Sequence, residues 1–440
     1  MKTNKFTLIL TILIILITSL CSLRTSKTET LSTSAEIEHL SAPEVDFPIY
    51  SQGAVLLESS TGKILYGKNE NEKLYPASTT KILTAIIAIE NYKLTDKVTA
   101  NNTAIMAIPS GYSNAGIQPG ETLTVEELLQ LFLIHSANEV GYIFAEDISG
   151  SVDNFANLMN KKATEIGCKN THFTNPSGIH NVEHYSTAYD MALIAQYCMK
   201  NETFRSIVSM PSCTIEPTDK YEKRYFKNTN DLLDSKSKYY YENAIGIKTG
   251  FTTQAKNCLI AGSKKDDMEL ITVVLGAEAT ADGRSGRYID TINLFDYGFA
   301  NYKIQKINSA NTEIQSLTIK NATKETKNLP LILKDNISAL VPTNMDTSNL
   351  KYNIDVNTEI SAPIVEGDVL GKLTYNIDGI NYSSNLIAEH SVEKFNYYLL
   401  ALQIFVALVV LLILIKLIFF RKKKKDNYYS RNYNSYYRLK

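Results

Sequence analysis

Ser78 and Lys81, which follow Pro76, are the pair in this sequence best suited to nucleophilic chemistry. A serine hydroxyl is a weak nucleophile and needs a base within hydrogen-bond reach. On a helix, a spacing of three residues places both side chains on one face, and the helix N-terminus favours negative charge on the serine oxygen. Lys81 can act as the base only when it is neutral. Its pKa must therefore fall from about 10.4 towards neutrality, which burial and a neighbouring cation would both cause.

The order of three short motifs is more specific than the Ser78/Lys81 pair alone. The same serine–lysine spacing recurs elsewhere, but only Ser78 opens a strongly apolar helical pattern; the other pairs are Ser60/Lys63, Ser235/Lys238, Ser348/Lys351 and Ser391/Lys394. Ser136, Ala137 and Asn138 follow an apolar run, and a second Ser-Ala-Asn begins at Ser309. Lys248, Thr249 and Gly250 form the only Lys-Thr-Gly in the chain and end a predicted strand. Gly250 would allow the backbone to approach a ligand closely.

The ordered set Ser-x-x-Lys, Ser-x-Asn and Lys-Thr-Gly matches the signature of penicillin-binding proteins and class A β-lactamases. Residues 75–81, 170–178 and 184–192 resemble segments of the serine-type D-alanyl-D-alanine carboxypeptidases, which are penicillin-binding proteins of low molecular mass. Residues 362–364, with Gly367 and Gly371, resemble the β-rich second domain of the same family. The resemblance covers most of residues 45 to 390. It implies an enzyme that removes the terminal D-alanine from peptidoglycan stem peptides and is inhibited by penicillins.

The resemblance also implies roles for the residues of acyl transfer. Ser78 would attack the carbonyl between the two terminal D-alanines and form an acyl-enzyme, with Lys81 accepting its proton. Ser136 would relay a proton to the leaving amine. The backbone N–H groups of Ser78 and Phe251 would form the oxyanion hole, where loss of one donor typically costs roughly 10² to 10³ in rate. Phe251 replaces a polar residue of some relatives, which a backbone contribution tolerates.

The remaining implied residues bind the substrate. Asn138 would hold the peptide, and Lys248 and Thr249 would contact its terminal carboxylate, with Lys248 also helping to keep Lys81 neutral. Gly250 and Phe251 would line the substrate beside them. Arg284 resembles an arginine that family members place near that carboxylate. A solvated arginine at a helix start is an equally good interpretation. The serine–lysine scheme needs no histidine, so no direct role is expected for His135, His180 or His184.

The pattern of elements predicts an α/β (α+β) fold in which helices flank an antiparallel sheet, as in β-lactamases and penicillin-binding proteins. Short alternating runs from about residue 305 to 390 predict a small all-β domain. Within the first domain we expect a hairpin at 54–66, helices from 78 and at 125–134, 152–166, 189–198 and 287–299, and strands at 245–248, 258–261 and 270–275.

The two ends of the chain predict where the protein is located in the cell. Lys2 and Lys5, followed by apolar residues 6–20, are typical of a secretory signal peptide, assigned to 1–21, with an uncleaved anchor as the alternative. Residues 397–420 are long and apolar enough to cross a bilayer as a helix, and the basic residues 421–425 follow at once. By the positive-inside rule that end is cytoplasmic. The domains are then a linker over 22–45, a catalytic domain over 46–301, the all-β domain, the membrane helix and a basic, Tyr-rich tail over 421–440.

Composition fits this interpretation and limits the alternatives. The 440 residues carry a formal net charge of -1, so no nucleic-acid partner is expected, and no clustered ligand set predicts a metal or cofactor. The cysteines are widely spaced, and disulfides cannot be assigned. A β-lactamase remains an alternative, although no Glu-x-x-Leu-Asn segment lies between Asn138 and Lys248. A non-catalytic penicillin-binding wall sensor is another, as is transpeptidation with an amine replacing water.

Overall fold

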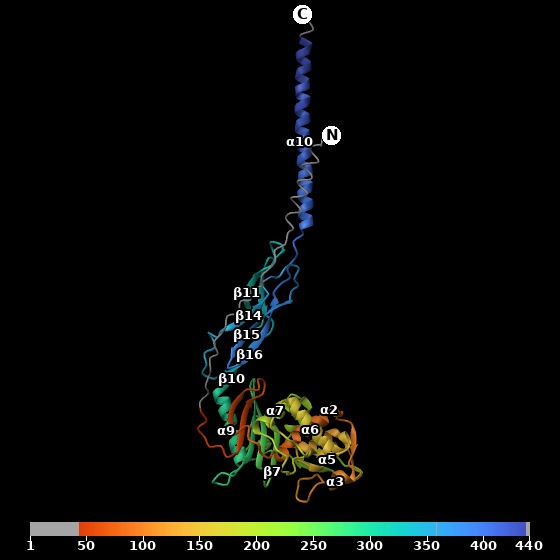
Figure 1. The fold of residues 1–440 in the computed structure, drawn as a ribbon, viewed down its shortest axis with the longest axis vertical. Coiled ribbons are helices and arrows are strands. Elements are labelled where there is room, and N and C mark those ends of the chain that lie inside the picture. The colour runs from red at the N-terminus through yellow and green to blue at the C-terminus, as the bar shows by residue number, and fades with distance from the viewer. Residues whose placement is uncertain (1–43, 358, 437–440) are drawn as a thin grey trace. The chain divides into compact units, whose positions relative to one another are not determined.

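The computed structural model describes residues 44–357 and 359–436, with side chains described as far as residue 420 (Figure 1). The predicted signal peptide, nearly all of the predicted linker and the end of the tail lie outside the described residues. The chain divides into two compact units. Of the described residues, the first unit contains 44–305 and Ser338–Ser348, and the second contains Lys306–Ile337, 349–357 and 359–436.

A five-stranded antiparallel sheet forms the centre of the first unit. Its strands are β1 (Gly53–Glu58), β2 (Ile64–Lys68), β7 (Ala244–Thr252), β8 (Lys256–Lys265) and β9 (Met268–Ala277), in the order β2-β1-β9-β8-β7. β1 pairs with both β2 and β9, and β8 pairs with both β9 and β7. β2 and β7 are therefore the edge strands, and β7 carries the Lys-Thr-Gly motif.

Helices cover both faces of this sheet, which explains why all six residues of β1 are buried. Alternate residues of a strand point to opposite faces. Val55, Leu57 and Val273 belong to the core that the sheet shares with the helical cluster. Leu56 and Leu270 lie against α9 instead, because a Cβ added at Gly298 of α9 would meet their side chains at 3.1 and 2.6 Å.

Some helices of the first unit begin or end at recognisable capping residues. Thr124 and Glu127 form a capping box at the start of α4, and Ser151 caps α6, which ends at Gly167 in a left-handed conformation. The bounds are α2 Lys81–Asn91, α3 Asn102–Met106, α4 Val125–Leu133, α5 Asn138–Ser149, α6 Val152–Ile166, α7 Ala188–Met199, α8 Glu202–Val208 and α9 Gly286–Asn301, with the 3-10 helices η2 Ala77–Thr80 and η3 Asp231–Leu233. Short strand pairs are β3 Lys97–Thr99 with β4 Thr122–Thr124, β5 Ser212–Ile215 with β6 Arg224–Lys227, and β10 Tyr302–Asn308 with β13 Ile337–Pro342.

The second unit contains a five-stranded sheet in the order β11-β12-β16-β15-β14. Its strands are β11 Glu313–Thr318, β12 Asn328–Leu333, β14 Tyr352–Val356, β15 Val369–Ile377 and β16 Ile380–Ala388. Asp378 and Gly379 connect β15 to β16 with positive φ angles of 51° and 79°, as a two-residue hairpin turn requires. The expectation of a sheet flanked by helices, followed by a small β-rich region, is thus confirmed.

The chain continues into α10 (Tyr397–Tyr436), in which Tyr397–Phe420 is long and apolar enough to cross a membrane. Its large apolar side chains are exposed. Sequence analysis missed α3, α5, α8, the β3–β4 pair and the β5–β6 hairpin. α5 was missed because its first turn coincides with the Ser-Ala-Asn motif and not with an apolar repeat.

Candidate active site

Ser78 lies in a tight turn that leads directly into α2. The turn is the 3-10 helix η2, and the residue before the serine, Ala77, has a φ of 47°, an unusual value for a residue with a Cβ. Thr79 fixes the turn, because its Oγ1 donates a hydrogen bond to the Pro76 carbonyl at 2.6 Å. Ser78 therefore faces the cavity described below, while Lys81, at the first position of α2, is fully buried.

Three oxygen atoms surround the Lys81 ammonium nitrogen. Nζ lies 2.8 Å from Ser78 Oγ, 2.8 Å from Asn138 Oδ1 and 2.7 Å from the Ser177 carbonyl. The carbonyl and amide oxygens can only accept hydrogen bonds. A neutral amine has two N–H donors and one lone pair. Those two acceptors would use both donors and leave the lone pair for the Ser78 hydroxyl proton.

The surroundings of Lys81 favour its neutral form. Burial, and then the charge of Lys248, lower the pKa of Lys81 well below its ordinary value, while Glu139 acts in the opposite direction. Burial, and then the Arg287 charge, lower the pKa of Lys248 to about 7. The sequence-based requirement for burial and a nearby cation is therefore met in the fold, with Lys248 as the cation.

The Ser-Ala-Asn motif forms the turn between α4 and α5. Ser136 has a φ of 67° and lines the cavity. The Asn138 amide is held at both ends, because its Oδ1 accepts from Lys81 and its Nδ2 donates to the Ser113 carbonyl at 2.7 Å. Asn138 lines the cavity too, but in this structure its amide is committed to the lysine and to the segment around Ser113.

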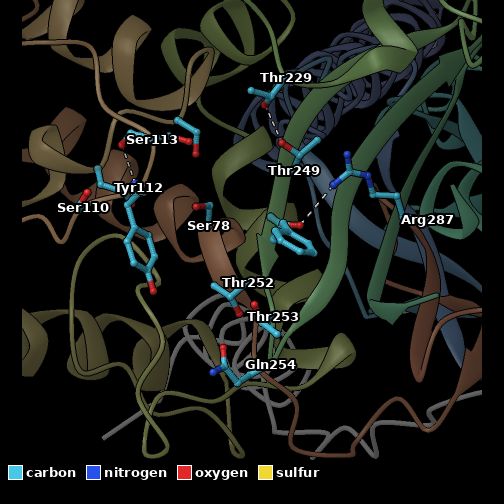
Figure 2. Close-up of a pocket in the computed structure, with 15 residues that line it drawn as sticks. Ser78, Ser110, Tyr112, Ser113, Thr229, Thr249, Thr252, Thr253, Gln254 and Arg287 are labelled. Atoms are coloured by element: carbon cyan, nitrogen blue, oxygen red, sulfur yellow. Dashed lines mark hydrogen bonds between the residues drawn. The ribbon is translucent and has the colours of Figure 1, made fainter. Parts of the chain in front are cut away.

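The Lys-Thr-Gly motif lies on the edge strand β7. Lys248 is buried, and its Nζ donates to the Thr249 carbonyl at 3.2 Å. Thr249 Oγ1 lies 2.7 Å from Thr229 Oγ1 (Figure 2). Phe251 differs from both, because the residue is 62% exposed at the rim of the cavity.

Gly250 brings β7 against the turn that carries Ser78. A Cβ at this position would lie 3.1 Å from the Ser78 backbone nitrogen and 3.1 Å from the Pro76 carbonyl oxygen. Gly178, with a φ of 76°, closes the other side: a Cβ there would meet the Ala77 carbonyl oxygen at 1.8 Å. Glycines on two segments thus let the backbone enclose η2.

These segments surround a cavity of about 550 Å³ (Figure 2). Figure 2 shows Ser78 between two walls, with Ser110, Tyr112 and Ser113 on one side and Thr229 and Thr249 on the other. Hydroxyl groups dominate the described lining, whose one charged side chain is Arg287. The lining residues are Ser78, Ser110, Gly111, Tyr112, Ser113, Ser136, Asn138, Thr229, Thr249, Gly250, Phe251, Thr252, Thr253, Gln254 and Arg287.

The structure does not bring Arg284 into this cavity. Arg284 is about half exposed, and its Nε donates to Asp282 at 2.7 Å in the loop before α9. Arg287, one helical turn further along the chain, lines the cavity instead, and its Nη1 lies 3.4 Å from the Gly250 carbonyl oxygen. The reason is the helix start: α9 begins at Gly286, so Arg287 projects from its first turn whereas Arg284 precedes it.

Comparison with known proteins gives the family. A family profile described as D-alanyl-D-alanine carboxypeptidase matches residues 38–279, more than half of the 440 residues. The chain belongs to the D-alanyl-D-alanine carboxypeptidase family. A second profile, the C-terminal domain of penicillin-binding protein 5, matches residues 302–394.

Individual carboxypeptidases match over most of their length. D-alanyl-D-alanine carboxypeptidase DacF of Bacillus subtilis is 36% identical over 351 residues, which are 78% of this chain and 86% of that protein. Penicillin-binding protein 5 of Haemophilus influenzae has a similar structure, with a TM-score of 0.62 and 29% identity over 81% of this chain and 100% of that chain. The Streptomyces K15 DD-transpeptidase has a TM-score of 0.53 and 31% identity, covering 59% of this chain and 100% of that one.

The chain is therefore a serine-type D-Ala-D-Ala carboxypeptidase with the fold of penicillin-binding proteins. Reaction through an acyl-enzyme, action on peptidoglycan stem peptides and inhibition by penicillins follow from the family.

Sequence analysis missed several groups of this carboxypeptidase site. Tyr112 and the adjacent wall residues carry no motif, and Thr229 precedes a short 3-10 helix without a signal of its own. Ser177 belongs to a segment that resembled the family, but a backbone carbonyl contact cannot be predicted from residue type. His184 is buried beneath the site, with Nε2 2.9 Å from Thr80 Oγ1, and burial lowers its pKa to about 3, which keeps it neutral.

Proposed function

We propose that Ser78 is the nucleophile of the carboxypeptidase and Lys81 its base. The three contacts of Lys81 Nζ carry the proposal, because two fixed acceptors leave the nitrogen lone pair for the Ser78 proton. Ser78 Oγ attacks the carbonyl carbon between the two terminal D-alanines, and the C–N bond breaks. The terminal D-alanine leaves after its nitrogen accepts a proton, which Ser136 relays. Water then hydrolyses the ester on Ser78 and releases the shortened peptide.

The substrate carboxylate binds at the end of the cavity lined by Thr249 and Arg287, next to the buried Lys248. Thr249 offers a hydroxyl, and the two cations offer positive charge. A bound carboxylate would raise the pKa of Lys248 and keep it charged. Its charge would in turn keep Lys81 neutral, so substrate binding would favour the reactive form of the base. Arg287 replaces Arg284 in this role.

The oxyanion forms between the backbone N–H groups of Ser78 and Phe251. The close approach of Gly250 to the Ser78 nitrogen supports this assignment, because it brings β7 beside the turn that carries the serine. β7 is also an edge strand, so an extended peptide can lie beside it in the manner of an added strand. Asn138 orients Lys81 through its Oδ1, and it reaches the peptide only if Nδ2 exchanges its bond to Ser113.

The enzyme acts at the outer surface of the membrane. An apolar helix at Tyr397–Phe420, followed by five basic residues, supports a single crossing with a cytoplasmic C-terminus. The predicted signal peptide over residues 1–21 would export the linker (22–45), the catalytic domain (46–301) and the all-β domain (305–390), and leave only the tail (421–440) inside.

Labelling with a fluorescent penicillin tests the proposal. The parent chain should retain the label, and mass spectrometry should locate it on Ser78. Ser78→Ala and Lys81→Ala should abolish labelling while circular dichroism remains unchanged. Ser60→Ala is the matched control, because it removes the serine of another Ser-x-x-Lys pair whose Oγ binds Glu58 at 2.9 Å.

Three results would contradict the proposal. Rapid turnover of the penicillin would indicate a β-lactamase, and absence of label from the parent would indicate a wall sensor without catalysis. Acylation of Lys81→Ala at near-parent rates would show that another group is the base.

A further inference from the structure

One wall of the cavity is a loop without helix or strand, residues 107–121, called the wall loop below. Ser110, Gly111, Tyr112 and Ser113 of this loop line the cavity (Figure 2). A loop that must form a defined surface needs contacts from a more rigid neighbour. Here the neighbour is the turn from His135 to Glu139, at the start of α5.

Three side chains of that turn bind consecutive carbonyl and N–H groups of the wall loop. His135 Nε2 lies 3.1 Å from the Asn114 carbonyl oxygen, and Asn138 Nδ2 lies 2.7 Å from the Ser113 carbonyl oxygen. Glu139 Oε1 accepts a hydrogen bond from the Ala115 N–H at 2.6 Å. The same turn therefore contacts both the cavity wall and, through Asn138, the Lys81 amine.

Glu139 is the charged member of this set, and its burial is costly. It is 2% exposed, and its second oxygen, Oε2, has no hydrogen-bond partner among the described residues. Burial raises the pKa of Glu139, while its backbone hydrogen bonds and Lys81 oppose that rise. A neutral glutamine could accept the Ala115 hydrogen bond at a lower desolvation cost. The negative charge therefore needs a second explanation.

Positive charge around the site supplies that explanation. Lys81 and Lys248 are buried, Arg287 acts on Lys248, and the described cavity lining contains no carboxylate. Glu139 is the acid whose charge acts on Lys81. Of the other titratable groups nearby, His135 before α5 interacts with Lys248, and His184 interacts with Lys81. Tyr142 on α5 interacts with Tyr112 in the wall loop.

We propose that Glu139 is a positioning residue with two separable effects: its reach fixes the wall loop through Ala115, and its charge opposes the effect of Lys248 on the Lys81 amine. This inference rests on the proposed function, because it assumes that Lys81 is the base for Ser78. Neither effect places Glu139 in contact with the substrate. Two conservative substitutions separate the effects, since glutamine keeps the reach and loses the charge, whereas aspartate keeps the charge and loses the reach.

The effect of the Glu139 charge on Lys81 is tested with the substitution Glu139→Gln. The full chain in detergent is acylated with a fluorescent penicillin across the pH range, and the rate is followed on Ser78. Because the Glu139 charge raises the pKa of Lys81, its loss lowers that pKa and enlarges the neutral fraction at low pH. Relative to the plateau rate, acylation on the acid limb should rise about tenfold over the parent. A uniform fall in rate without movement of the acid limb would overturn the charge effect.

The effect of the Glu139 side-chain length on the wall loop is tested with the substitution Glu139→Asp and a diacylated peptide ending in D-Ala-D-Ala. The shorter side chain should lose the Ala115 hydrogen bond and loosen the wall loop. KM should then rise about tenfold, with the acid limb of the acylation profile unmoved. An unchanged KM would overturn the loop effect.

Glu146→Ala is the control for both substitutions. Glu146 lies on the same helix, two turns further along, and accepts a hydrogen bond from Thr103 Oγ1 at 2.9 Å. It should leave the pH profile and KM at parent values. If the parent itself fails to label on Ser78, the proposed function fails. If the parent labels and the Glu139 variants match it, only the present inference fails.

Discussion

At the scale of single residues, the site depends on side chains whose hydrogen-bond partners decide their protonation. Lys81 Nζ faces two oxygens that can only accept and one hydroxyl that can donate. The two acceptors use both N–H groups of the neutral amine, so its lone pair is left for the Ser78 hydroxyl proton. Ala77, which precedes Ser78, and Ser136, which is the serine of the Ser-Ala-Asn motif, have positive φ angles of 47° and 67°. Such values persist only where the surrounding structure enforces them.

The two nearby arginines give a prediction at this scale. Arg287→Ala should raise KM for a peptide ending in D-Ala-D-Ala about 10- to 100-fold, because a charge-assisted contact to the terminal carboxylate is lost. Arg284→Ala is the matched control and should leave KM unchanged, since its guanidinium pairs with Asp282 outside the cavity. Steady-state kinetics on both variants measure the difference. Equal effects from the two substitutions would contradict the assignment.

Residue identity predicted much of this site but not all of it. The three motifs identified Ser78, Lys81, Ser136, Asn138 and the Lys-Thr-Gly residues, and the structure brings all of them to one place. The resemblance offered Arg284, whereas Arg287 lines the cavity; the helix start was predicted to within one residue of Gly286, but the pattern could not show which of the two arginines faces the site. Contacts from the Ser177 carbonyl and from Glu139 depend on the backbone path, which no motif encodes.

At the scale of elements, the position of β7 at the edge of the sheet determines how the site is assembled. β7 pairs with β8 on one side only, and its Gly250 lies against η2. The order β2-β1-β9-β8-β7 pairs strands that are far apart in the chain, β1 with β9 above all. The sequence therefore predicted that β7 is a strand but not that it lies at the edge of the sheet. Hydrophobic patterns identify strands well, whereas pairing order depends on the whole sheet.

Gly250→Ala tests this contact between elements. The new methyl group would lie 3.1 Å from the Ser78 nitrogen and should push η2 away from β7, so acylation by penicillin should fall about 100-fold. Gly67→Ala on β2, the other edge strand, is the control, because its Cβ meets only the flexible end of Glu70. Penicillin acylation rates and thermal unfolding of both variants are the measurements. Parent-like acylation of Gly250→Ala would show that η2 can accommodate the methyl group.

At the scale of the whole molecule, catalysis competes with stability. The pKa of Lys248 is lowered to about 7 in the fold, against 10.5 in the unfolded chain. Between these values the unfolded chain binds more protons, so the free energy of unfolding rises with pH by up to about 1.4 kcal/mol per pH unit for this lysine. Burial lowers the pKa of Lys81 as well, and acts in the same direction.

Lys248→Met should therefore stabilise the protein at pH 7, where the parent carries most of the cost of a buried ammonium. The gain should shrink as pH approaches 10, because the parent lysine becomes neutral in the fold with little remaining cost. Denaturant unfolding of parent and variant at several pH values measures the difference. A gain that stays constant with pH would show that the charge of Lys248 is not responsible. Lys265→Met, at an exposed site, is the control.

The proposed membrane anchor gives a second prediction at this scale. A chain that ends before Tyr397 lacks the apolar helix Tyr397–Phe420 and should be recovered from the soluble fraction. Its kcat/KM for a soluble peptide should equal that of the full chain, since the site residues all belong to the first unit. Retention of the shortened chain in the membrane fraction would contradict a single C-terminal anchor.

The exposed ring of Phe251 has an optical consequence. The 440 residues include no tryptophan, so the protein's ultraviolet emission comes mainly from tyrosine. Phe251 stands at the rim of the cavity with 62% of its surface open to solvent, where a larger indole has room. A tryptophan introduced there would be a solitary fluorophore beside the reacting bond. Its brightness would follow the arrival and departure of each acyl group in real time, without any dye attached to the ligand.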